Sequence, residues 1–180
     1  VIIASPNYSH GDYLNYFINS ATPILCEKPL FWKKDLSTES IEEYFRFLKE
    51  HKTSKIFLNT TSRYLARAVK NQISKYSGSS SFEFIFNTHG REKYENIGID
   101  LLPHAFSILH ELFGYKRITQ IHSDFSSFKF NTTFKYGKLN VGFYLSENVK
   151  LDKYFAFSID ENRFERVQLG RGDTYSLYLV

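Results

Sequence analysis

Three segments combine residue types and spacings that could support chemistry. The first is Cys26-Glu27-Lys28-Pro29, which ends a short apolar run. The second is the pair Asp100 and His104, whose four-residue separation places both side chains on one face of a helix. The third is Ser5-Pro6-Asn7 with His10, directly after the opening apolar run. An ammonium, a carboxylate and an imidazole are groups that move protons and stabilise a developing alkoxide.

Each segment taken alone also has a purely structural interpretation. A Lys-Pro sequence is common in surface turns, and Ser-Pro-Asn is ordinary turn chemistry ahead of a helix. Pro103 fits a helix only in its first turn, so we expect Asp100 and His104 near the N-terminus of a helix from Ile99 to Phe113. There the aspartate could be a cap and the histidine a buried imidazole.

The elements that must position these groups begin with strands and helices in alternation. Val1 to Ala4 is predicted to be a buried strand, followed by strands at Ile24 to Cys26 and Lys55 to Asn59. Between them, Ser9 with Asp12 and Ser40 with Glu43 are candidate starts of two amphipathic helices. This order is typical of the second half of a dinucleotide-binding fold, in which ligands bind at the carboxyl ends of the strands.

The rest of the chain is predicted to be mostly antiparallel. A helix opens at Ser62 with Tyr64, Leu65, Ala68, Val69 and Ile73 on its apolar side, and ends near Gly78. After a strand over Phe82 to Phe86 and the helix closed by Gly114, alternating residues predict two hairpins: Phe128 to Leu145 with a turn at Gly137, and Tyr154 to Leu169 with a turn at Asp160 and Glu161.

The predicted fold class is therefore α/β and α+β. It comprises the C-terminal half of a Rossmann-like parallel sheet in a partial dinucleotide-binding domain (1–61), then a mostly antiparallel open sheet covered by helices in a substrate and oligomerisation domain (62–180). The first half of the parallel sheet would lie upstream of Val1. The absence of methionine also indicates that these residues are not an intact translation product.

Composition narrows the function classes. The 23 basic and 19 acidic residues give a net charge of +4 but are interspersed, which argues against a nucleic-acid partner. Basic residues do alternate with aromatic ones between Phe128 and Tyr136, but a half-buried strand explains this more simply than a stacking platform.

Cys26 is the only cysteine, which suits a reducing, cytoplasmic setting. No stretch has the length of a membrane span or the pattern of a signal peptide.

Four short motifs, in this order along the chain, resemble the Gfo/Idh/MocA oxidoreductase family, which includes glucose-fructose oxidoreductase and inositol dehydrogenase. They are Ser-Pro-Asn with His10, Glu-Lys-Pro, Arg63-Tyr64 and Asp100-x-x-x-His104. The resemblance runs from Val1 to about Gly114. It implies an enzyme that uses NAD or NADP to oxidise or reduce a hydroxyl or keto group of a sugar, sugar derivative or cyclitol. It also implies a homo-oligomer formed through the C-terminal sheet.

The resemblance further implies roles for individual residues. Lys28, Asp100 and His104 would meet at the nicotinamide, with His104 as the base, Lys28 stabilising the alkoxide and Asp100 orienting both. No metal is implied, and the Lys28-Pro29 peptide is a candidate cis bond. The implied cofactor-binding residues are Ser5, Pro6, Asn7, His10, Glu27, Lys28, Pro29 and Arg63.

The sequence also departs from the family pattern. Ser107 stands where members commonly carry an acid, only Gly98 remains of the glycines that usually precede the aspartate, and the Gly-rich phosphate loop is absent. We therefore expect this chain alone to bind cofactor weakly or not at all. The alternative is a truncated, non-catalytic family member that acts as an interaction or oligomerisation module through its open aromatic sheet.

Overall fold

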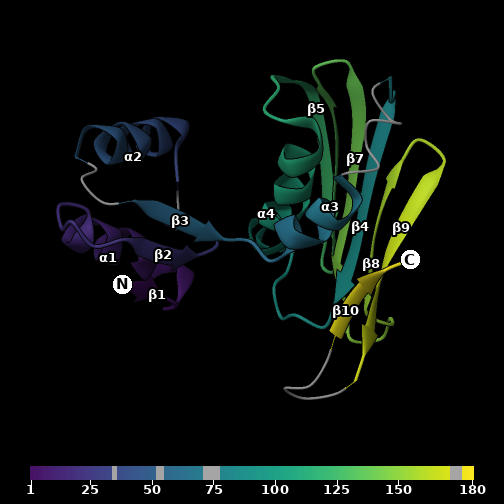
Figure 1. The fold of residues 1–180 in the computed structure, drawn as a ribbon, viewed down its shortest axis with the longest axis horizontal. Coiled ribbons are helices and arrows are strands. Elements are labelled where there is room, and N and C mark those ends of the chain that lie inside the picture. The colour runs from purple at the N-terminus through teal and green to yellow at the C-terminus, as the bar shows by residue number, and fades with distance from the viewer. Residues whose placement is uncertain (34–35, 52–54, 71–77, 171–175) are drawn as a thin grey trace. The chain divides into compact units, whose positions relative to one another are not determined.

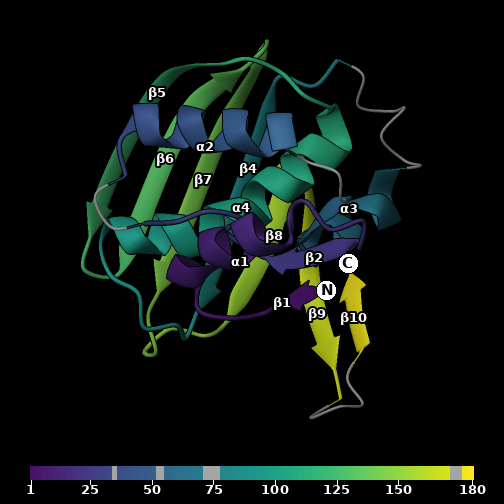
Figure 2. The ribbon, with the colours of Figure 1, turned by 90° about the vertical axis from the view of Figure 1, so that its left-hand side faces the viewer.

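The computed structural model describes residues 1–33, 36–51, 55–70, 78–170 and 176–180, and all structural statements concern these residues. The chain divides into two units, Val1–Thr60 and Thr61–Val180, and each is described by itself. Most of their helices and strands are labelled in Figure 1, and β6 (Lys129–Tyr136) is labelled in Figure 2. No helix in the described ranges is long and apolar enough to cross a membrane.

The first unit is a three-stranded parallel sheet with two helices. The strands lie in the order β1-β2-β3, and each adjacent pair is parallel. The elements are β1 (Ile2–Ile3), a 3-10 turn η1 (Asn7–Ser9), α1 (His10–Phe17), β2 (Ile24–Glu27), α2 (Thr38–His51) and β3 (Ile56–Asn59). The carboxyl ends of all three strands therefore lie at the same edge of the sheet.

One face of this sheet is a core and the other is exposed. Leu14 of α1 and Leu48 of α2 pack with Ile3 and Cys26 on the covered face. Ile2 is in register with Leu25 on the opposite face, and 76% of the Ile2 side chain is exposed. The prediction that Val1 to Ala4 is a buried strand is thus wrong except at Ile3, because successive strand residues point to opposite faces.

The second unit is a seven-stranded mixed sheet with helices on one face. The order is β10-β9-β8-β4-β7-β6-β5, in which β4 and β7 are parallel and the other neighbours antiparallel. Figure 2 shows α4 lying across the sheet. The elements are α3 (Ser62–Lys70), β4 (Ser81–Thr88), α4 (Glu95–Phe113), β5 (Ile118–Ser126), β6 (Lys129–Tyr136), β7 (Leu139–Glu147), β8 (Tyr154–Ile159), β9 (Asn162–Leu169) and β10 (Ser176–Leu179). The predicted fold class is confirmed.

Alternating phenylalanines form the core of this sheet. Phe82 and Phe84 of β4 are fully buried, and the ring of Phe84 meets those of Phe143 and Phe155 edge to face. Both predicted hairpins are confirmed: β6 pairs with β7 across a turn that contains Gly137, and β8 pairs with β9 across residues 160 and 161. Gly137 has φ 62°, a conformation that favours glycine.

Helix α4 differs from its prediction at its start. The helix begins at Glu95 rather than Ile99, so Pro103 lies in its interior and Asp100 and His104 are not in its first turn. The added turn buries Ile97 and packs Gly98 against the ring of Phe130, where an alanine Cβ would lie 2.9 Å from the ring. We infer that this packing offsets the hydrogen bond that proline removes.

Two predicted helix caps are also wrong. Ser9 precedes α1 but makes no side-chain cap, because its hydroxyl donates to the carbonyl of Pro6, 2.8 Å away. Helix α2 begins at Thr38, before the predicted cap at Ser40, and the Ser37 hydroxyl instead accepts from the Ser40 backbone N–H at 3.2 Å. Helix α3 starts at Ser62 as predicted, and Ile73, which was expected to continue it, lies outside the described residues.

Candidate active site

The carboxyl edge of the first unit brings together the turns after β1 and β2. Pro6 and Asn7 are exposed in the first turn, and Glu27, Lys28 and Pro29 are half-buried in the second. The Lys28-Pro29 peptide is cis, as the resemblance led us to expect. In parallel sheets wound with helices this edge is where ligands bind.

His10 connects these two turns. Its Nδ1 lies 2.8 Å from the carbonyl oxygen of Pro29, and its Nε2 lies 2.8 Å from the carbonyl oxygen of Ser5. Only 1% of the residue is exposed. Both ring nitrogens therefore face the protein backbone, and the imidazole links the turn after β1 to the turn after β2.

Two further groups sit at the ends of β2 and β3. The Asn59 side-chain amide donates to Oε1 of Glu27 at 2.6 Å, which ties the two strand ends together. Burial, and then the charge of Glu27, raise the pKa of the Cys26 thiol to about 11. Because the nucleophile is the thiolate, the raised pKa and the buried position both disfavour a nucleophilic role for Cys26.

In the second unit, α4 carries Asp100 and His104 on one face, and both are half-buried. His104 Nδ1 lies 3.0 Å from the hydroxyl oxygen of Ser62, a buried residue at the start of α3. The imidazole also meets the ring of Phe86 edge to face. These contacts fix the orientation of the ring, which a proton-transferring histidine requires. One turn further along α4, the Ser107 hydroxyl donates to the backbone carbonyl of His104 at 2.8 Å.

The structure adds Glu147, which sequence reasoning missed, to the surroundings of Asp100. Glu147 ends β7 and is 2% exposed. Burial raises its pKa first of all, and the neighbouring Asp100 carboxyl group raises it further. A signal was present in the sequence: Glu147 continues the alternation of Leu139, Val141, Phe143 and Leu145, and so falls on the buried face of its strand.

Arg63 joins a cluster of charges between α3 and α4. Its Nε donates to the carboxylate of Glu111, which also accepts from Arg67 Nε at 3.3 Å and Lys70 Nζ at 3.0 Å. All three basic side chains are about half exposed. The cluster fastens α3 to α4, and so holds Ser62 beside His104.

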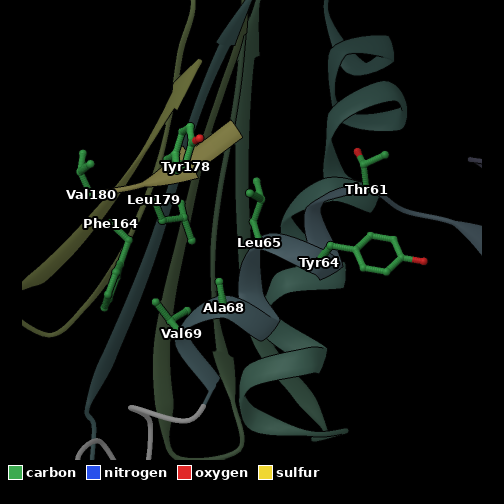
Figure 3. Close-up of a pocket in the computed structure, with 9 residues that line it drawn as sticks. All are labelled: Thr61, Tyr64, Leu65, Ala68, Val69, Phe164, Tyr178, Leu179 and Val180. Atoms are coloured by element: carbon green, nitrogen blue, oxygen red, sulfur yellow. The ribbon is translucent and has the colours of Figure 1, made fainter. Parts of the chain in front are cut away.

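A cavity of about 750 Å³ lies elsewhere in the second unit, between α3 and the strands β9 and β10. Figure 3 shows Leu65 and Val69 of α3 facing Phe164 and Leu179 across it. None of the predicted site residues lines this cavity, and its walls are mainly apolar. Among the described residues, no group of three or more His, Cys, Asp or Glu side chains is placed to hold a metal ion.

The predicted site residues thus form two groups. The first unit brings Ser5, His10 and Pro29 into direct contact, with Lys28 in the same turn as Pro29. The second unit brings Asp100 and His104 onto one helix face. Because Lys28 belongs to one unit and the pair on α4 to the other, their convergence is part of the proposal below.

No family model matches the sequence, and no curated protein matches it. Solved structures do match. The WlbA dehydrogenase of Thermus thermophilus, crystallised with NAD and UDP-GlcNAcA, superposes with a TM-score of 0.72 at 19% identity, over 96% of this chain and 61% of that one. A putative oxidoreductase of Magnetospirillum magnetotacticum matches with a TM-score of 0.70 at 17% identity, over 92% of this chain and 56% of that one.

GenD2 of gentamicin A biosynthesis, crystallised with NAD, matches with a TM-score of 0.68 at 14% identity, over 91% of this chain and 52% of that one. The chain therefore spans between half and about three fifths of the length of these three proteins. Its structural neighbours are Gfo/Idh/MocA-type oxidoreductases, and over the part of their length that it spans the chain has their fold.

Proposed function

We propose that this chain is part of an NAD- or NADP-dependent oxidoreductase that transfers a hydride between the nicotinamide and a hydroxyl or keto carbon of a sugar, sugar derivative or cyclitol. The observation that carries the proposal is the Asp100–His104 pair on α4, with the imidazole fixed by Ser62, in a chain with this oxidoreductase fold. A sugar nucleotide is the first substrate to test, because the WlbA dehydrogenase was crystallised with UDP-GlcNAcA.

The reaction requires that a proton leave the hydroxyl oxygen as a hydride leaves the carbon. His104 accepts that proton, Lys28 stabilises the developing alkoxide, and Asp100 balances their charge. A bound nicotinamide would supply the hydride acceptor. The residues that fit the cofactor are those of the two turns at the carboxyl edge of the parallel sheet, where Ser5 to Asn7 and Glu27 to Pro29 lie. Arg63 adds a half-exposed cation.

We propose that the first unit belongs to a dinucleotide-binding domain and the second unit to a substrate and oligomerisation domain. The exposed apolar face of the first unit supports this, since parallel sheets are usually covered on both faces. A strand followed by Gly-x-Gly-x-x-Gly upstream of Val1 in the gene would supply the phosphate-binding turn. The single cysteine, Cys26, is free and buried, which suits an enzyme of the reducing cytoplasm.

Hydride transfer by the full-length protein is the decisive measurement. With UDP-GlcNAcA and NAD, we expect absorbance of the reduced nicotinamide to rise, and His104→Ala to lower kcat by about a hundredfold or more with the fold intact. Lys28→Met is expected to lower kcat while cofactor affinity changes little. Full turnover in His104→Ala would remove His104 as the base, and full turnover in Lys28→Met would remove Lys28 from the mechanism.

A second role, as an oligomerisation module, is supported by the uncovered face of the large sheet. There Tyr144 lies over Gly142 and is partly exposed, and Thr133 and Glu83 are in register with Gly142. We propose that copies of this chain associate through this face. Light scattering of the full-length protein should give a mass above the monomer that Tyr144→Asp lowers. An oligomer without hydride transfer would favour the non-catalytic alternative.

A further inference from the structure

Glu147 is a buried carboxyl group that the proposed mechanism leaves without a role. It stands at the end of β7, on the face that its strand otherwise fills with apolar side chains, and it is 2% exposed. A buried carboxyl group is costly unless it is hydrogen-bonded or neutral. Its presence on this face therefore needs an explanation from its contacts.

One side of the carboxyl group is fitted to the loop that follows β4. Oε2 accepts a hydrogen bond of 2.7 Å from the backbone N–H of Glu92. Gly90 packs directly against the group, so that a Cβ at this position would lie 1.9 Å from Oε2 and 2.3 Å from the carboxyl carbon. Only glycine leaves room there. Glu147 therefore anchors the segment between Gly90 and Glu92.

The other side of the group faces negative charge. Oε1 is buried, and no described protein group donates a hydrogen bond to it. Burial is the largest cause that raises the pKa of Glu147. The charge and hydrogen bonding of Asp100 and the charge of Glu92 raise this pKa further, whereas the hydrogen bond from the Glu92 backbone N–H lowers it. Two carboxyl groups in a shared buried site do not both ionise readily, and a proton kept by one lets it donate to the other.

We propose that Glu147 is a positioning residue for Asp100: a buried carboxyl group that anchors the 90–92 loop and shares a hydrogen bond with the Asp100 carboxyl group. The inference rests on the proposed function for its catalytic consequence. With the proton on Glu147, the hydrogen bond holds the Asp100 side chain in place on the face of α4 that also carries His104. Glu147 itself touches neither substrate nor cofactor.

Two substitutions in the full-length protein separate positioning from mere burial. Glu147→Gln keeps an oxygen that accepts from Glu92 and an amide that donates to Asp100, so kcat should stay within about threefold of wild type. Glu147→Leu keeps the volume but loses both bonds, so kcat should fall by about tenfold or more, with little change in KM for NAD. The matched control is Glu161→Gln, an exposed carboxylate in the turn between β8 and β9, which should change nothing.

A readout that needs no turnover tests the pair directly. With carbon-13 at the carboxyl carbons of glutamate and aspartate, NMR titration should show Glu147 protonated well above the usual glutamate pKa of about 4.3. Asp100→Asn removes the neighbouring charge and should lower that pKa. This arm stays informative if Glu147→Leu fails to fold.

Either arm can overturn the proposal. Wild-type kcat in Glu147→Leu, or equal losses in the Gln and Leu variants, would contradict a positioning role. A Glu147 that titrates in the usual glutamate range, or that ignores Asp100→Asn, would contradict the proton-sharing pair. If wild-type protein shows the raised pKa but transfers no hydride from UDP-GlcNAcA or other sugar substrates, the proposed function fails while the carboxyl pair stands.

Discussion

Two buried glutamates of the second unit, Glu111 and Glu147, have opposite electrostatic surroundings. Glu111 lies on α4 opposite Arg63, Arg67 and Lys70, and a hydrogen bond from Arg63 is the largest cause that lowers its pKa, to about 2. Glu147 ends β7 beside Asp100, and its pKa is raised, by burial first. Burial is nearly the same, at 8% and 2% exposed. Burial raises the pKa of both carboxyl groups, and at Glu111 the hydrogen bonds and charges of the neighbouring cations outweigh it.

The difference matches two tasks. An ionised carboxylate with several cations around it is a clamp, and Glu111 holds α3 against α4, so that Ser62 reaches His104. A carboxyl group that keeps its proton can donate a hydrogen bond to a neighbouring carboxyl group, which is the role that we propose for Glu147 beside Asp100.

Gly90→Ala should be the most damaging change, because its Cβ would overlap the carboxyl group of Glu147. We expect a loss of about 3 kcal/mol in the free energy of unfolding, measured by urea denaturation. The control is Gly78→Ala, where nothing lies within 4 Å of the new Cβ. The double variant Gly90→Ala with Glu147→Ala should recover part of the loss. A Gly90→Ala protein as stable as wild type would contradict the close packing.

Glu111→Ala should cost about 2 kcal/mol in urea denaturation, because it leaves three basic side chains together without a counterion. Their half-exposed positions let water screen part of that repulsion, so the cost falls below that of a fully buried pair. Glu161→Ala, which removes an exposed carboxylate in the turn between β8 and β9, is the control and should have no measurable effect. Equal stability of Glu111→Ala and wild type would show that the cluster is no clamp.

The two glutamates should contribute to the pH dependence of stability with opposite signs. The folded pKa of Glu111 is depressed, so its contribution is full above about 4.5 and is lost as pH falls towards 2. The folded pKa of Glu147 is raised, so its contribution is full at acid pH and is lost as pH rises above the usual glutamate value. In urea denaturation across pH, Glu111→Gln should remove the first dependence and Glu147→Gln the second.

Added salt should have the smallest effect on stability, and it should change the contribution of Glu111 but not that of Glu147. In about 1 M sodium chloride, screening should weaken the Glu111 cluster by less than about 1 kcal/mol, because its cations are half exposed. The stability difference between wild type and Glu111→Gln should therefore shrink in salt, while that between wild type and Glu147→Gln should not. If salt also reduced the stability difference between wild type and Glu147→Gln, Glu147 would have to be ionised.

Patterns with a short period predicted most of the fold. Alternating phenylalanines in β4 and β6 and the hairpin turns identified the sheet, because strand periodicity is local in sequence. Helix ends were predicted less well. The extra turn of α4 ahead of Asp100 depends on Phe130 of β6, and the edge strands β5 and β10 carried no pattern that distinguished them.

Short-range patterns were enough to predict the alternation of strands and helices in the first unit, the two hairpins, and the position of Asp100 and His104 on one helix face, since all three follow from backbone geometry. The tertiary structure decided what surrounds these groups. Ser62 meets His104 across 42 residues, and Arg63 meets Glu111 across 48. Such distant partners set the ionisation of Glu111, because a carboxyl group responds to the charges within a few ångströms of it, whatever their place in the chain. At Glu147, burial is the largest cause of the raised pKa, and the Asp100 carboxyl group adds to it.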